Sequence, residues 1–166
     1  ELPNGHFGDT VARQFFYDSY HYFLLEQFLK VKDLKLQAIA EKSLKEVKYH
    51  LKWSSEWMIR LGDGTQESHD KIQEAVNSIL PYVKEAFILS DYQKVLIEEG
   101  LISNPEDFKA AWLTKVNEIL TEATIVADVE NAFAQKGGKD GIHTEHLGFI
   151  LTDLQYLQRT YPNSQW

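Results

Sequence analysis

Apolar side chains recur every three to four residues through most of this chain, which is the spacing of one face of an α-helix. No segment shows the strict alternation of apolar and polar residues that is typical of a half-buried β-strand. The pattern therefore predicts an all-α protein. The expected helices run from about Asp9 to Lys30, from near Asp33 to Gly62 as a C-terminal cap, from Thr65 with a kink or break at Pro81, from Ser90 to Gly100, from Asn104 with Pro105 in its first turn, and from about His143 to Arg159.

The second of these helices has two distinct faces when it is projected at about 100° per residue. One arc is apolar and includes Tyr49, Trp53 and Trp57, with Glu46 near the middle and His50 beside it. We therefore expect Glu46 to point into the core. The opposite arc is expected to face solvent and holds Glu41, Lys45, Lys48, Lys52, Ser55 and Glu56.

Polar residues also fall on the apolar stripes of the first and last helices. The first helix is apolar around most of its circumference, so we expect neighbours to enclose it. Asp18 lies on a stripe with Val11 and Leu25, which predicts a buried carboxylate. In the last helix, His143 and His146 share a stripe with apolar residues and are expected to face inward.

Buried carboxylates are costly unless they are paired, protonated or bound to metal, so Asp18 and Glu46 need partners. Helical bundles that hold two metal ions use Glu-x-x-His motifs, but Tyr49 stands three residues after Glu46 and His50 stands four after it. A hydrogen-bonded pair is favoured for Glu46 and His50, and a ligand role stays open.

A second candidate motif is the His-x-x-His spacing of His143 and His146. These two residues begin a helix directly after a glycine-rich loop at residues 135–141, where a histidine often serves as a cap or a packing residue. A structural or interface role is therefore favoured over metal binding for both.

Composition narrows the classes of function. The net charge of −8 and the lack of a Lys/Arg cluster predict no nucleic-acid partner. The chain has no cysteine, so disulfides and thiolate metal sites are excluded. No run of about 18 apolar residues occurs, so we expect no membrane span and a cytoplasmic protein. We expect one domain over residues 1–166, incomplete at its N-terminus because the chain starts at Glu1 without Met.

Three segments carry a resemblance to a known family: PNGHFGDTVARQFFYDSYH at 3–21, KEVKYHLKWSSEWMIRLGDGT at 45–65 and GGKDGIHTEHLGFILTDLQYLQRTYPNSQW at 137–166. They closely resemble the C subunits of bacterial multicomponent phenylacetyl-coenzyme A 1,2-epoxidases. The resemblance spans nearly all of the chain. Members of that family also have one or two earlier helices, so this chain resembles roughly their last two thirds.

The resemblance implies a ferritin-like helical bundle that acts in phenylacetate degradation. Such a C subunit pairs in a hetero-oligomer with a related A subunit, which carries a di-iron centre and epoxidises the aromatic ring of phenylacetyl-coenzyme A. The C subunit is regarded as a relative that lost its iron ligands, which implies no cofactor and no catalytic residue in this chain. In that picture, Asp18, Glu46, Tyr49 and His50 are vestigial metal-site positions held by hydrogen bonds.

Two hypotheses for the function follow from the sequence. The first is a non-catalytic structural subunit that pairs with the di-iron subunit and stabilises it. The alternative is a metal-dependent oxidoreductase with an unusual centre built from Asp18, Glu46 and His50, with His143 or His146 as a further ligand. The missing Glu-x-x-His motif favours the first.

Overall fold

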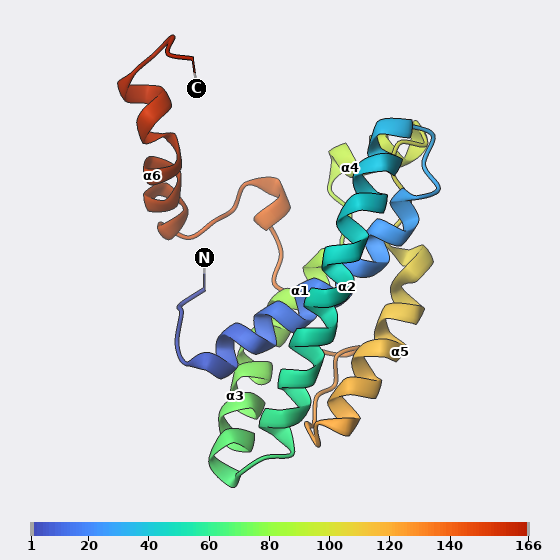
Figure 1. Cartoon of the computed structure of the whole chain (residues 1–166), viewed down its shortest axis with the longest axis vertical. Coiled ribbons are helices and arrows are strands. Elements are labelled where there is room, and N and C mark those ends of the chain that lie inside the picture. Colours follow the sequence, from blue (N-terminus) through green and yellow to red (C-terminus); the bar gives the residue numbers. More distant parts are fainter. Residues whose placement is uncertain (1, 166) are drawn as a thin grey trace. The chain divides into compact units, whose positions relative to one another are not determined.

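The computed structural model describes residues 2–165, and its regular elements in that range are all helical. The prediction of an all-α protein is therefore confirmed, and the arrangement is consistent with a ferritin-like helical bundle (Figure 1). The elements are α1 (Phe7–Phe28), α2 (Leu34–Gly62), α3 (Gln66–Val83), the 3₁₀ turn η1 (Lys84–Phe87), α4 (Asp91–Glu98), α5 (Glu106–Glu122), the 3₁₀ turn η2 (Gly138–Asp140) and α6 (His146–Thr160).

The chain divides into two compact units, each with its own helices. The main unit is Asn4–Gln135 and contains α1 to α5. The second unit combines residues 2–3 with residues 136–165 and contains α6. The expectation of a single domain over the whole chain stays a prediction. Within residues 2–165, none of the helices combines the length and the apolar character needed to cross a membrane.

Cap residues define most helix ends as the sequence predicts. The side chain of Asp33 accepts hydrogen bonds from the backbone N–H groups at the start of α2, and Thr65 does the same for α3. α5 starts one residue later than predicted, with Pro105 as its N-cap, and Asn104 Oδ1 accepts a hydrogen bond from the backbone N–H of Glu106, the first residue of the helix. Gly100 ends the segment after α4 with a positive φ of 69°, a conformation that favours glycine.

The predicted N-cap of the first helix is wrong. The N-cap of α1 is His6, and Asp9 lies inside the first turn. The carboxylate of Asp9 accepts a hydrogen bond of 2.7 Å from the backbone N–H of His6, which forms half of a capping box. Asp9 therefore stabilises this end of the helix from the third helical position.

The predicted left-handed cap at Gly62 is also wrong, because Gly62 is the last residue of α2 and its φ is not positive. Glycine is needed at this position because the end of α2 lies very close to the backbone of Ala123. A Cβ atom at this position would overlap the backbone carbonyl of Ala123, just after α5. The end of α2 can therefore pack directly against the backbone that follows α5.

The core of the main unit surrounds α1, which contacts α2, α3 and α5 (Figure 1). Its buried aromatic residues form an edge-to-face and tilted cluster, in which the ring centroids of Phe87 and Trp112 are 4.7 Å apart. Phe108 joins the same cluster at 5.8 Å from Phe87. Burying each such side chain contributes about 1.5–3 kcal/mol. Tyr20 of α1 packs edge-on against Phe87 at 5.3 Å between centroids, so this cluster ties η1 and α5 to α1. Pro81 lies inside α3, one turn before η1 begins, where the prediction placed a kink or break.

Candidate functional site

The buried carboxylate of Asp18 is the centre of the candidate site. Asp18 lies on α1 with only 1% of its surface exposed, so the prediction that it is buried is confirmed. Its Oδ2 accepts a hydrogen bond of 2.9 Å from Ser54 Oγ on α2. Its Oδ1 accepts a hydrogen bond of 2.6 Å from Gln14 Nε2, one turn earlier on α1. Each carboxylate oxygen thus has a neutral side-chain donor, which offsets part of the cost of burial.

A second network lies next to Asp18 on the same helix. Ser19 is completely buried, and its hydroxyl accepts a hydrogen bond of 3.0 Å from the indole N–H of Trp112. Ser19 Oγ in turn donates to the carbonyl oxygen of Phe16. The polar groups of adjacent residues on α1 therefore tie this helix to α2 through Asp18 and to α5 through Ser19.

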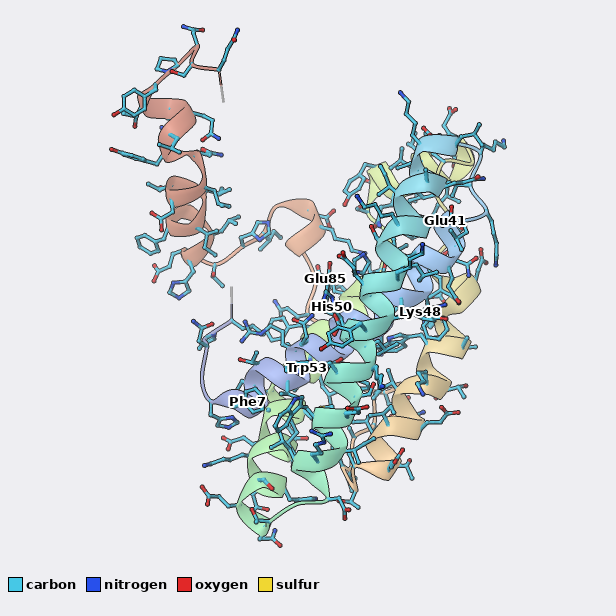
Figure 2. All side chains as sticks on the ribbon, viewed as in Figure 1. Phe7, Glu41, Lys48, His50, Trp53 and Glu85 are labelled. Atoms are coloured by element: carbon cyan, nitrogen blue, oxygen red, sulfur yellow. The ribbon has the colours of Figure 1, made fainter. Side chains whose placement is uncertain are left out.

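The expectation that Glu46 points into the core is wrong. Glu46 and His50 are exposed on α2, and Tyr49 has 66% of its surface exposed. Figure 2 shows His50 and Trp53 on one side of α2, away from Lys48 and Glu41 on the other side. The helix therefore carries an exposed face between its buried stripe and its charged face.

The buried stripe of α2 follows a seven-residue spacing and lies to one side of the projected apolar arc. The projection counts Tyr49, Trp53 and Trp57 as core residues. This shifts the face of α2 that is expected to be buried toward Glu46. Trp53 and Trp57 are in fact only partly buried and pack edge-on against Phe7 of α1. The expectation that Ser55 faces solvent is wrong as well, because Ser55 is buried. The buried residues of α2 are Ala40, Leu44, Val47, Leu51, Ser54, Ser55, Met58 and Gly62.

His21 links the buried carboxylate electrostatically to the exposed face. Partial burial lowers the pKa of the His21 imidazole, Asp18 opposes that shift, and His50 adds to it. His21 therefore lies within electrostatic range of both residues, and its ring also contacts that of Tyr17, at 5.3 Å between centroids. His21 is not among the residues predicted from the sequence, although its position one turn after Asp18 on the same helix is a usable signal.

Ser54 is also absent from the predicted site, and it is the residue that satisfies Asp18 across the helix interface. The signal is present in the sequence, because Ser54 stands between Leu51 and Met58 on the buried stripe of α2. Ser54 is one of two buried serines of α2, and its hydroxyl has a partner on a neighbouring helix, whereas Ser55 Oγ is buried without a hydrogen-bond partner in the described part of the chain.

The predicted metal-site positions do not come together as a set of ligands. Within residues 2–165, no three His, Asp or Glu side chains gather closely enough to hold a metal ion. Asp18 is occupied by Ser54 and Gln14, while Glu46 and His50 are exposed. The side chains present in this arrangement therefore do not fit a centre of two iron ions, and no chemical step is assigned to them.

His143 and His146 belong to the second unit. His146 is the first residue of α6 and His143 precedes the helix, so the expected helix start is three residues too early. Both are exposed, and the apolar stripe of α6 is not buried within its own unit. The expectation that these histidines face inward is thus not met within that unit, while the proposed structural or interface role stays a prediction.

Comparison with known proteins identifies the family. A family model described as phenylacetic acid catabolic protein matches residues 1–166, which is the whole chain. The chain belongs to this family. It is 43% identical over 166 residues to the C subunit of the 1,2-phenylacetyl-CoA epoxidase of Escherichia coli (strain K12). The match covers 100% of this chain and 66% of that relative, so the chain spans slightly less than two thirds of the relative's length.

Membership of the phenylacetic acid catabolic protein family confirms the resemblance drawn from the three sequence segments. Two of these segments contain the residues of the candidate site: residues 3–21 include Asp18 and His21, and residues 45–65 include Glu46, His50 and Ser54. The hydrogen bond between Asp18 and Ser54 therefore joins two of the segments on which the resemblance rests.

Proposed function

We propose that this chain is part of a non-catalytic, structural subunit of a phenylacetyl-coenzyme A epoxidase complex that acts in phenylacetate catabolism. The single observation that carries the proposal is the state of Asp18. A carboxylate on the inner face of a ferritin-like bundle suits a metal ligand, yet here both of its oxygens accept hydrogen bonds from Gln14 and Ser54. Neutral side-chain donors thus satisfy the carboxylate that a metal ion would bind in a catalytic relative.

The remaining vestigial positions support the same proposal. Tyr49 stands where the Glu-x-x-His motif of a di-iron bundle has its histidine, and a phenol is a poor substitute for imidazole as an iron ligand. Glu46 and His50 are exposed, and the buried carboxylate is bonded to Ser54 and Gln14 instead. Asp18, Glu46, Tyr49 and His50 are therefore proposed as remnants of a metal site in a subunit without a cofactor of its own.

The partner in this proposal is the di-iron catalytic subunit of the same complex. Support comes from the name of the relative, which is one subunit of an epoxidase, and from large apolar side chains on the surface of the main unit. Tyr17 on α1 is 57% exposed and Tyr49 on α2 is 66% exposed. Aromatic residues of this kind are enriched where protein surfaces meet.

Iron analysis of the natural full-length protein tests the proposal. The protein is produced in iron-supplemented cells, purified alone and together with the catalytic subunit, and its iron is quantified per subunit. We expect a stable hetero-oligomer in which all stoichiometric iron belongs to the catalytic subunit. Stoichiometric iron in the protein purified alone, or a monomer that does not bind the catalytic subunit, would contradict the proposal.

A further inference from the structure

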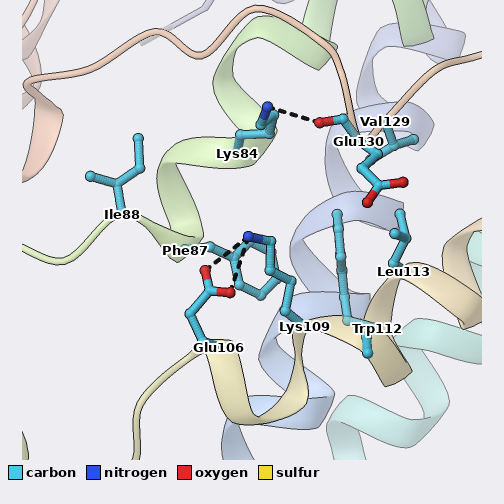
Figure 3. A pocket seen from close by; sticks show the side chains of 10 residues that line it. Lys84, Phe87, Ile88, Glu106, Lys109, Trp112, Leu113, Val129 and Glu130 are labelled. Atoms are coloured by element: carbon cyan, nitrogen blue, oxygen red, sulfur yellow. Dashed lines mark hydrogen bonds and ion pairs between the residues drawn. The ribbon is translucent and has the colours of Figure 1, made fainter.

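A cavity of about 430 Å³ between η1, α5 and the segment that follows α5 contains charges that are already matched (Figure 3). Lys109 Nζ lies 2.8 Å and 3.2 Å from the two carboxylate oxygens of Glu106. Lys84 Nζ donates to the backbone carbonyl oxygens of Glu130 and Ala132. The carboxylate of Glu130 also lines the cavity. Two ammonium groups thus face two carboxylates, and the cavity selects no charged ligand.

The lysines of α2 are arranged differently, because four of them lie on one side of the helix. They are spaced by three, three and four residues, which makes each one a neighbour of the next on the helix surface. Figure 2 shows Lys48 on the side of α2 that is opposite His50 and Trp53. We call this exposed set the lysine face, and it consists of Lys42, Lys45, Lys48 and Lys52.

Two members of the lysine face have partners at its C-terminal end. Lys52 Nζ lies 3.8 Å from Glu56 Oε1, and the other carboxylate oxygen of Glu56 lies 3.6 Å from Arg60 Nη2. Lys48 Nζ lies 6.0 Å from the ring centroid of Tyr22 on α1, which is a cation–π contact. Glu56 is therefore shared between two cations, and Lys48 rests on an uncharged ring.

Lys42 and Lys45 have no ion-pair partner within residues 2–165. Glu46 and Glu41 stand one turn away from them along α2, but neither carboxylate lies within 4 Å of these ammonium groups in the described part of the chain. Like charges one turn apart repel each other and destabilise a helix. The lysine face is thus unfavourable in the isolated protein, and an acidic partner would relieve the repulsion.

The charge of α2 is opposite in sign to that of the whole chain. α2 contains five Lys and one Arg against three Glu, a net charge of +3, whereas the chain carries −8. A protein with a net negative charge repels an acidic partner at long range, so a local positive face sets the orientation in which that partner approaches. Complementary charges of this kind mainly raise the association rate.

Tyr49 adds an aromatic contact beside the lysines. It stands four residues after Lys45 and three before Lys52, so it neighbours both on the helix surface, and 66% of its surface is exposed. Tyrosine is enriched where protein surfaces meet. The combination fits an apolar patch rimmed by carboxylates on another protein. It fits a nucleic-acid backbone less well, because the three glutamates of α2 repel phosphate.

We propose that the lysine face and Tyr49 dock an acidic surface of the catalytic subunit. The inference rests on the proposed function, since it names the surface chemistry of the partner proposed there. The lysines steer the catalytic subunit toward α2 and speed its association. The ring of Tyr49 slows dissociation once the two surfaces are in contact.

Association kinetics test the proposal. The natural full-length protein and the purified catalytic subunit are followed by biolayer interferometry at about 20 mM and about 200 mM NaCl. We expect the association rate to fall about tenfold over this range. Replacing both unpaired lysines, as Lys42→Glu with Lys45→Glu, should lower the association rate at low salt about tenfold and change the dissociation rate by less than about twofold. Tyr49→Ala should instead raise the dissociation rate about tenfold.

The matched control changes the net charge by the same amount at another place. Lys71→Glu with Lys94→Glu replaces two exposed lysines on α3 and α4, which pair with Glu67 and Asp91 and lie outside the lysine face. The association rate of this control should stay within about twofold of the unmodified protein. Equal unfolding midpoints of the two double variants establish that both are folded.

Several results would overturn the inference. Equal slowing in both double variants would assign the effect to net charge alone. A normal association rate in Lys42→Glu with Lys45→Glu would remove the role of the lysine face and leave the proposed function intact, whereas no complex with the unmodified protein would contradict both. A DNA duplex of about 20 base pairs or a phosphatidylserine vesicle that binds at about 150 mM salt, and only with the lysines present, would assign the face to a polyanion.

Discussion

Ser54 Oγ on α2 donates a 2.9 Å hydrogen bond to Asp18 Oδ2 on α1, joining two buried side chains that lie 36 positions apart in the sequence. The hydroxyl also lies 3.0 Å from the carbonyl oxygen of His50, one turn earlier on its own helix. The contact stands where the two most closely packed helices of the main unit meet. It specifies how α1 and α2 pair, because any shift along the interface would leave a buried carboxylate short of a donor.

Removing the Ser54 hydroxyl should therefore destabilise the protein. In Ser54→Ala, Asp18 keeps the hydrogen bond from Gln14 and loses the one from Ser54. Leaving a buried charged acceptor without one of its donors lowers the unfolding free energy by about 1–3 kcal/mol or more. The measurement is chemical denaturation of the natural full-length protein. Thr114→Ala is the control, because its exposed hydroxyl bonds only within α5, to the carbonyl of Ala110, and should change the unfolding free energy by less than about 0.5 kcal/mol. Equal stability of both variants would contradict this account of Asp18.

Gly62 should tolerate no side chain. In Gly62→Ala the new methyl group meets the backbone carbonyl of Ala123, which cannot move aside as a flexible side chain would. We expect a loss of about 1–3 kcal/mol in unfolding free energy from the forced backbone shift. The matched control is Gly148→Ala in α6, where a Cβ meets nothing within 4 Å and alanine favours the helix by up to about 1 kcal/mol. Thermal unfolding of the two variants distinguishes them, and a neutral Gly62→Ala would refute the close approach.

The titration of His21 should report on Asp18. Burial holds the pKa of His21 below 6.5, and Asp18 acts in the opposite direction. Asp18→Asn should therefore lower the pKa of His21 further, and His50→Gln should raise it, because the charge of His50 contributes to the lowering. NMR titration of the His21 ring measures both changes. A rise in the His21 pKa in Asp18→Asn would show that the two groups do not interact as described.

Because the pKa of His21 is lowered in the folded protein, the stability of the protein should fall as the pH is lowered. The unfolded chain takes up a proton near pH 6.5, before the folded protein does. The contribution of neutral His21 to stability is therefore fully present above about pH 6.5 and is lost as the pH falls through the lower folded-state pKa. Denaturation midpoints measured from about pH 7.5 to about pH 5 should decline less in His21→Gln than in the unmodified protein. An equal decline in both would remove His21 as a cause.

Local signals in the sequence predict most of the helix ends. Asp33, Thr65 and Asn104 are short polar side chains at the starts of helices, and each accepts a hydrogen bond from a backbone N–H within three residues of itself. Local chemistry of this kind does not depend on the rest of the fold. The role of Gly62 depends instead on Ala123, more than 60 residues away, which no local pattern reveals.

The candidate site is predictable only in part for the same reason. The stripe of α1 correctly places Asp18 in the core, because its neighbours along the stripe are aliphatic. On α2 the aromatic residues Trp53 and Trp57 shift the projected core toward Glu46, although rings of that size can remain half exposed while packing on Phe7. The cavity beside Lys84 could not be predicted, because its lining comes from separate elements brought together by the fold.

Turnover of the assembled complex tests the central claim most directly. The full-length protein carrying both Glu46→Gln and His50→Gln is combined with the catalytic subunit and its reductase, and epoxidation of phenylacetyl-coenzyme A is measured after assembly has been verified. Because both side chains are exposed, we predict turnover within about twofold of the unmodified complex. A loss of turnover by orders of magnitude in a correctly assembled complex would contradict a non-catalytic role.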